Sequence, residues 1–123
     1  MSFPTTTRNG YSVDRSTALE ASSISKATKG KLYRFAGKID TTAATDIYYI
    51  QLLNASSLPG DGAVTTLVAP LEVNHTNGTS TLFDFDLGPR GVQASSGIVI
   101  VASTTEFTKT IAGNVMSATV LFD

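Results

Sequence analysis

The chain has 123 residues, 41% of them hydrophobic and 15% charged, and a formal net charge of -1. This length suits one ordinary domain, and the absence of cysteine excludes a disulfide framework, a thiolate zinc site and a cysteine nucleophile. The nine basic residues are scattered along the sequence, which excludes the concentrated basic patch that binds nucleic acid. The polar part consists largely of Ser and Thr, which suit strands and turns and give a neutral surface for contact with another protein.

The first 17 residues are polar, contain Pro4 and Gly10, and show no sustained hydrophobic period. They predict an extended N-terminal arm over 1–17, in front of a domain over 18–123; a frayed terminus is the alternative. The first eight residues lack the apolar core of a signal peptide, and no stretch approaches the roughly 20 apolar residues that cross a bilayer. We expect a protein made in the cytoplasm, without signal-peptide export or membrane contact.

From residue 18 the pattern is that of short strands separated by turns. A weakly apolar strand is predicted over 18–27 and is expected at a sheet edge. The turn at Lys29-Gly30 leads into a strand over 31–39. Apolar and charged residues alternate along this strand, which indicates one buried face; its predicted buried residues are Tyr33, Phe35 and Ile39.

The next strand is predicted over 46–54, with both faces at least partly covered, because apolar residues stand on each. One face carries Tyr48, Ile50 and Leu52, and the other carries Ile47, Tyr49 and Leu53. After a turn at 59–62, a strand over 64–73 is interrupted by Pro70, which indicates an edge or a bulge. A polar loop is predicted over 74–79.

The last third of the chain predicts three strands. The strand over 82–87 places Phe83, Phe85 and Leu87 inward and two aspartates outward. The run over 96–105 contains five consecutive apolar residues, four of them β-branched, so it predicts a central strand covered on both faces, between the strands at 82–87 and 115–123. A connection over 106–114 with room for one short strand leads to the strand over 115–123, whose inward residues are Met116, Ala118, Val120 and Phe122.

Seven or eight strands without a helical period predict an all-β fold. Regular spacing and turn residues favour a two-sheet antiparallel β-sandwich, with jelly-roll or immunoglobulin-like topology and the extended arm in front.

Few residues offer chemistry. His75 is the only histidine, and in a polar loop it is interpreted as a solvated residue, because a catalytic triad needs an orienting carboxylate and an activated hydroxyl. Asp84 and Asp86 share a strand face about 7 Å apart and could serve a hydrolase or bind Ca²⁺, but calcium normally needs six or more oxygens. Alternating aspartates are typical of a solvated face. We therefore predict no catalytic, cofactor-binding or metal-binding residue and no enzyme activity.

Two further patterns have ordinary explanations. Tyr33, Tyr48 and Tyr49 could stack on a sugar, but aromatic residues in phase with aliphatic ones favour a core role. The three Asn-x-Ser/Thr triplets, at Asn54, Asn74 and Asn77, arise by chance in a Thr-rich chain.

Five segments stand out in order along the chain: GKLYRFAG at 30–37, DIYYIQLLNA at 46–55, LPGDG at 58–62, FDF at 83–85 with GPRG at 88–91, and GIVIVASTT at 97–105. This succession resembles small β-sandwich structural proteins of tailed bacteriophages, over about 18–123.

The resemblance implies a virion component, most plausibly a capsid decoration or cement protein that binds between major capsid subunits and stabilises the head. Such proteins often bind as trimers and clasp a neighbour with an N-terminal arm. We therefore expect a homotrimer in a virion assembled in the host cytoplasm, with the major capsid protein or another virion protein as partner. The residues expected to contact that partner are Phe3, Pro4, Arg8 and Tyr11.

Similar sandwiches also serve in tails, baseplates and fibres. The alternative is therefore a receptor- or carbohydrate-binding role there, with the loops at 40–45 and 74–80 as contacts.

Overall fold

The structure is a computed structural model that describes residues 5–8 and 11–123, with side chains from residue 11 onward. Within these ranges the chain forms ten strands and no helix, so the all-β prediction is confirmed. It follows that these residues hold no helix of the length and apolarity that a membrane span requires. The strands are β1 (Thr5–Arg8), β2 (Tyr11–Arg15), β3 (Ser22–Lys26), β4 (Gly30–Ile39), β5 (Asp46–Leu53), β6 (Leu71–His75), β7 (Thr81–Asp86), β8 (Val92–Ala94), β9 (Ile98–Ser103) and β10 (Met116–Phe122).

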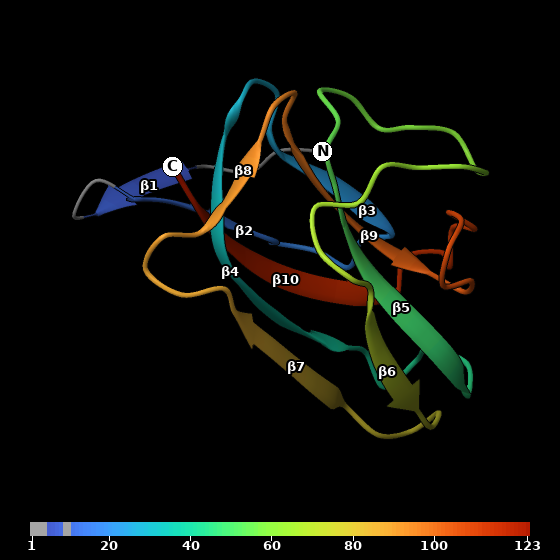
Figure 1. Cartoon of the computed structure of the whole chain (residues 1–123). Coiled ribbons are helices and arrows are strands. Elements are labelled where there is room, and N and C mark those ends of the chain that lie inside the picture. Colours follow the sequence, from blue (N-terminus) through green and yellow to red (C-terminus); the bar gives the residue numbers. More distant parts are fainter. Residues whose placement is uncertain (1–4, 9–10) are drawn as a thin grey trace.

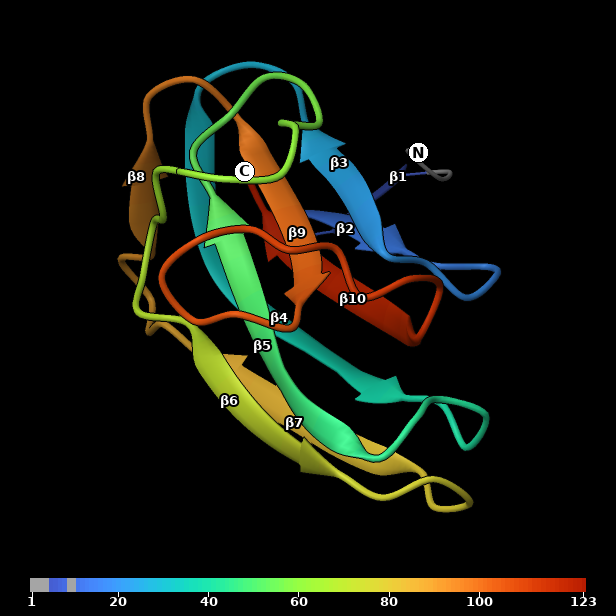
Figure 2. The same cartoon turned by 90° about the vertical axis from the view of Figure 1, so that its right-hand side faces the viewer.

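The strands form two antiparallel sheets packed face to face (Figure 1 and Figure 2). One sheet has the order β1-β2-β10-β4-β7, with β8 also paired to β4, and the other has the order β3-β9-β5-β6. Apart from β1 and β8, this is the strand order of a jelly roll, in which most successive strands alternate between the two sheets. The predicted two-sheet sandwich is therefore confirmed, and its topology is the jelly roll.

The first strand of the jelly roll is β2, which lies inside the segment predicted as an arm. It pairs with β10 over residues 12–15, and β1 pairs in turn with β2, so this hairpin widens the six-stranded sheet. The segment is extended, as expected, but the predicted boundary at residue 18 falls after the first strand of the sandwich. No apolar alternation marks β2, because its buried position opposite Val120 is occupied by Asp14.

The main core lies between the two sheets and is built from inward residues of the seven strands β4 to β10. The predicted set of Tyr48, Ile50 and Leu52 on β5 and the predicted set on β10 are buried there, as are Phe35 and Ile39 of β4 and Phe83 of β7. A second, smaller cluster lies on the outer face of the four-stranded sheet, where Leu53, Val99 and Val101 are covered by Ile24, Ala55 and Val64. Both faces of β5 are thus partly covered, as predicted.

Strand β9 is buried along its whole length, which confirms the prediction that both of its faces are covered. Its neighbours in the sheet are β3 and β5. The expectation that it lies between β7 and β10 is wrong, because the jelly roll places both of those strands in the opposite sheet. Its inward side chains pack across the core against that sheet.

Strand β4 departs from simple alternation at Tyr33. The register with β10 shifts there, since Leu121 is opposite Arg34 while Phe122 is opposite Leu32. This extra residue reverses the phase of the strand, so Leu32 points into the core and Tyr33 is only partly buried. The prediction that Tyr33 shares the core face of Phe35 is therefore wrong.

Two other predicted strands are shorter than expected. Residues 64–70 form no strand and are joined to the sheet by isolated hydrogen bonds, including the one from the Leu67 N–H to the Leu52 carbonyl at 2.7 Å. Strand β6 begins at Leu71, after Pro70. Residues 106–114 make only isolated bridges at Lys109 and Ile111. On β7, Phe85 is partly exposed, but its ring stacks on Phe35 at 5.6 Å.

Candidate interaction surface

The predicted partner-binding residues lie in or before the β1–β2 hairpin. Phe3 and Pro4 lie outside the described residues. Arg8 ends β1 and is opposite Tyr11, the first residue of β2. The Tyr11 ring meets the Tyr33 ring edge-on at 4.7 Å, so this end of the hairpin packs on the outer face of its own sheet.

His75 is not the solvated loop residue that the sequence predicts. It ends β6, is 3% exposed, and its Nδ1 lies 2.8 Å from the Thr81 hydroxyl. Its Nε2 is buried and has no hydrogen-bond partner among the described residues. Because its one hydrogen bond goes to a threonine hydroxyl and not to a carboxylate, His75 lacks the orienting acid of a catalytic triad.

Asp84 and Asp86 are both exposed, as predicted, and bind different groups. The Arg34 guanidinium donates to both oxygens of Asp84, with Nε 2.8 Å from Oδ1, and this contact lowers the pKa of Asp84. Asp86 accepts the Gly88 N–H at 2.8 Å. A carboxylate whose pKa is lowered is a poor general acid, so Asp84 is unsuited to donate the proton in a hydrolase pair. Within the part of the chain that is described, no three His, Asp or Glu side chains gather as a metal site would require.

Two carboxylates are buried at the start of the sandwich, Asp14 on β2 and Glu20 just before β3. The Ser16 hydroxyl donates to Glu20 Oε2 at 2.9 Å and accepts the Ala118 N–H at 3.1 Å. Burial raises the pKa of Glu20, opposed by this hydrogen bond, and the charge of Asp14 raises it further. The two hydrogen bonds of the Ser16 hydroxyl link the β2–β3 connection to β10, so Ser16 and Glu20 have a structural role.

The Glu20→Gln variant is expected to be more stable than the wild-type chain at pH 7. The folded-state pKa of Glu20 lies above its unfolded value, so ionisation of this group opposes folding once the pH exceeds those values. The difference in melting temperature between the two proteins should shrink as the pH falls and vanish near pH 3, where the carboxyl is protonated in both states. Thermal unfolding followed by circular dichroism from pH 3 to 7 measures this. The exposed Glu72→Gln variant controls for loss of charge, and an equal pH profile for both variants would contradict the prediction.

The loop over 104–111 is fastened to the four-stranded sheet by polar groups that the sequence does not reveal. Gln51, fully buried on the outer face of β5, places Nε2 at 2.9–3.2 Å from the backbone carbonyls of Thr105, Glu106 and Thr108. The Ser103 hydroxyl accepts the Thr105 and Thr110 N–H groups at 3.1 and 3.0 Å. Figure 2 shows this loop lying across β5 and β9.

A buried lysine joins this loop to the turn at 59–62. Lys109 is 4% exposed, and its Nζ donates to Asp61 Oδ1 at 3.0 Å. Lys109 and Gly62 also exchange both backbone hydrogen bonds, at 2.7 and 2.8 Å. The contact with Lys109 lowers the pKa of Asp61. The two loops therefore form one hydrogen-bonded layer over the outer face of the sheet.

Beside this layer lies a surface that we call the acidic face, made of Tyr49, Glu72, Glu106 and Phe107. Tyr49 and Glu72 are cross-strand partners on β5 and β6. Partial burial raises the pKa of Tyr49, and the charges of Glu72, Glu106 and Asp46 raise it further. At the loop tip, Phe107 is 81% exposed.

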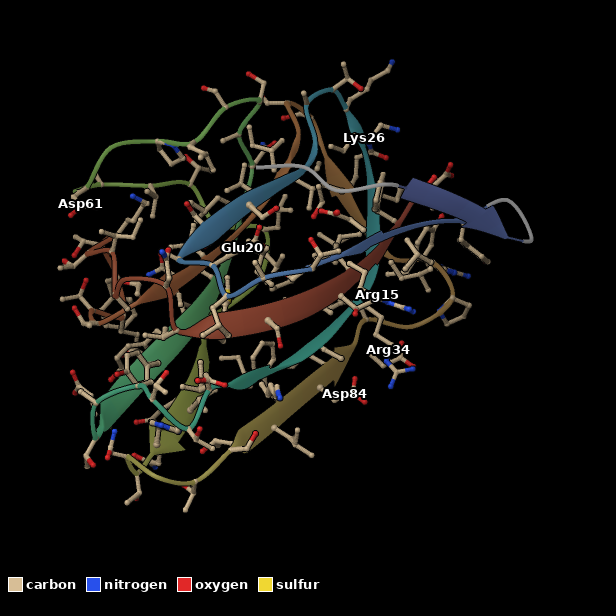
Figure 3. The ribbon with its side chains drawn as sticks, turned by 180° about the vertical axis from the view of Figure 1, so that it is seen from behind. Arg15, Glu20, Lys26, Arg34, Asp61 and Asp84 are labelled. Carbon is tan, nitrogen blue, oxygen red and sulfur yellow. The ribbon has the colours of Figure 1, made fainter. Side chains whose placement is uncertain are left out.

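Positive and negative charges are also separated along the sequence. No lysine or arginine occurs between Lys38 and Arg90, a stretch that includes β5, β6 and Glu72 of the acidic face. The basic groups of the described residues lie mostly on the six-stranded sheet and the β3–β4 turn, where Figure 3 shows Arg15, Arg34 and Lys26. The acidic face therefore carries exposed negative charge next to an exposed aromatic ring.

No protein-family model, curated protein or solved structure was found to match this chain. The class of the protein is therefore defined by its own topology, a jelly-roll β-sandwich with a hydrogen-bonded loop layer on one sheet.

Proposed function

We propose that this chain is a structural protein of a tailed bacteriophage, a decoration or cement protein that binds between major capsid subunits as a trimer and stabilises the head. The observation that carries the proposal is the exposed Phe107 on a loop that Gln51 and Ser103 hold in place. An exposed large aromatic side chain on a fixed loop marks a protein contact site. The order of the five sequence segments and the jelly roll, a fold common in viral capsid and lectin domains, support the phage assignment.

Cementing requires only that binding adds buried surface across a joint between subunits. A standard contact buries about 1,600 Å², and repetition around a symmetric site multiplies its effect. Internal pressure from packed DNA pulls such joints apart, so a rigid wedge that binds both sides resists it. A hydrogen-bonded sandwich suits this role, because it loses little conformational entropy when it binds.

The location of the chain in the particle tests this proposal. Heads and tails of the phage that encodes the chain are separated, and its copy number in each is measured by quantitative mass spectrometry. We expect it on heads, in a fixed ratio to the major capsid protein, and we expect heads made without it to release DNA at a lower temperature. Its presence on tails alone, or its absence from both, would refute the head assignment.

A second candidate function is receptor or glycan binding at a tail or fibre, and one observation favours it. The two loops predicted as contacts lie together: Gly78 N–H donates to the Thr41 carbonyl at 2.9 Å, and Asn77 Nδ2 donates to the Ala43 carbonyl at 3.0 Å. Their polar groups thus form one surface at the end of the sandwich. A glycan array probed with the purified chain tests this role, and an array without specific signals would count against it.

A further inference from the structure

We propose that the acidic face is the surface that docks on the partner protein, with Phe107 inserted into an apolar socket that has lysine or arginine residues at its rim. This inference rests on the proposed function, because the partner is taken to be the capsid surface. It differs from the expectation of an arm-mediated contact, since the docking residues come from β5, β6 and the loop over 104–111.

The position of Phe107 is set by the strand beneath it. Outward side chains alternate along β5, so Gln51 stands one position beyond Tyr49 on the same face. Gln51 binds the carbonyls on both sides of Phe107, those of Glu106 and Thr108, at 3.2 and 2.9 Å. The ring is therefore carried on a fixed piece of backbone next to Tyr49, and the Phe107 side chain itself is left to solvent.

Fixed backbone favours tight binding. The Thr105 hydroxyl donates to the Thr108 carbonyl at 2.8 Å, and the Thr104 N–H donates to the Thr110 carbonyl at 2.9 Å, so the loop is closed on itself as well as on β5. A loop already ordered before binding loses little entropy on contact. Aromatic anchors of this kind, inserted into a pocket, dominate the energy of many interfaces.

The charges of the acidic face select the partner. Glu72 and Glu106 form no ion pair, because the salt bridges among the described residues are Arg34–Asp84 and Lys109–Asp61. The only basic residue of the covering loops, Lys109, is buried against Asp61. A partner with cations around its socket would complement these two carboxylates and would be steered toward the face.

A second copy of this chain does not fit the acidic face as well. A two-fold contact would place the carboxylates of one copy against those of the other. Arg15 and Arg34 lie on the six-stranded sheet, on the far side of the molecule from Asp61 (Figure 3). A contact between these different faces of two copies would be heterologous, and it would form a ring or an open chain of molecules rather than a two-fold pair. The charges thus favour a different protein as the partner.

The test measures attachment of the purified chain to heads produced with its gene deleted. We expect Phe107→Ser to weaken attachment about tenfold or more. The matched control is Leu82→Ser on β7 of the opposite sheet, where Leu82 is 78% exposed, and this variant should bind within about twofold of wild type. The double variant Glu72→Lys, Glu106→Lys should also bind weakly, and added salt should weaken wild-type attachment. Since Phe107 and Leu82 are exposed, the melting temperatures of both variants should match that of wild type.

The other outcomes distinguish failure of the docking inference from failure of the proposed function. Failure of the wild-type chain to attach would refute the proposed function, and the docking inference with it. Normal attachment of Phe107→Ser would overturn the inference and leave the proposed function intact. Loss of attachment on deletion of residues 1–10, together with normal attachment of Phe107→Ser, would also overturn the inference, because it would identify the predicted arm contact. Self-association of the free chain that Phe107→Ser abolishes, measured by sedimentation, would show that the occupant is a second copy and would also overturn the inference.

Discussion

Replacing Phe35 with alanine is expected to lower the free energy of unfolding by about 3–5 kcal/mol, the usual cost of removing a buried phenylalanine side chain. Phe35 is among the largest fully buried side chains, and its ring contacts those of Phe85 at 5.6 Å and Phe83 at 6.4 Å. The cavity would lie in the middle of β4, the strand that joins β10 to β7. Urea denaturation followed by circular dichroism measures the change.

The control for this prediction is Leu82→Ala, on the neighbouring strand β7. Because Leu82 is 78% exposed, its truncation should change the free energy of unfolding by no more than about 0.5 kcal/mol. A loss below 1 kcal/mol for Phe35→Ala, or equal losses for the two variants, would contradict the placement of Phe35 at the centre of the core.

Strands with strict alternation could be predicted from the sequence, because side chains of period two report directly which face is buried. The inward residues of β5 and β10 are the clearest cases. Prediction failed where a polar residue occupies a buried position or where a bulge changes the phase. Asp14 occupies the buried position of β2, so no apolar alternation marks that strand. The extra residue at Tyr33 reverses the alternation of buried and exposed side chains within β4.

The candidate surface was less accessible to prediction than the fold. Gln51 interrupts an apolar run, which is the one sequence signal that a buried polar contact exists there, but the partners lie more than 50 residues away. Phe107 stands in a polar connection with no periodic pattern, so its exposure depends on a loop that tertiary hydrogen bonds hold. By contrast, His75 is buried because it continues the inward positions of β6 after Val73 and its ring packs against Tyr48 at 5.9 Å, whereas its polar neighbours in the sequence favour a loop.

The Gln51→Leu variant is expected to keep the sandwich and loosen the loop over 104–111. Leucine fills the space of the glutamine but removes an amide donor from three backbone carbonyls. The Thr105 and Thr108 carbonyls keep hydroxyl donors, so the expected cost of about 1–3 kcal/mol of unfolding free energy comes chiefly from the Glu106 carbonyl. Removal of the buried Oε1, which has no partner among the described residues, offsets part of this cost. Hydrogen exchange should therefore rise at the Thr104 and Thr110 amides, whose acceptors belong to the same network.

The matched control is Gln93→Leu, which deletes an exposed amide that donates to the Gly30 carbonyl at 3.1 Å. Water can replace that bond, so the control should change neither stability nor exchange in the loop. Gln51→Leu should also weaken attachment to heads, although Gln51 is buried and touches no partner, because the loop that carries Phe107 would then have to be ordered during binding. Unchanged exchange at Thr104 and Thr110 would show that the loop is held by other contacts. In that case Gln51 would not be what presents Phe107 to its socket.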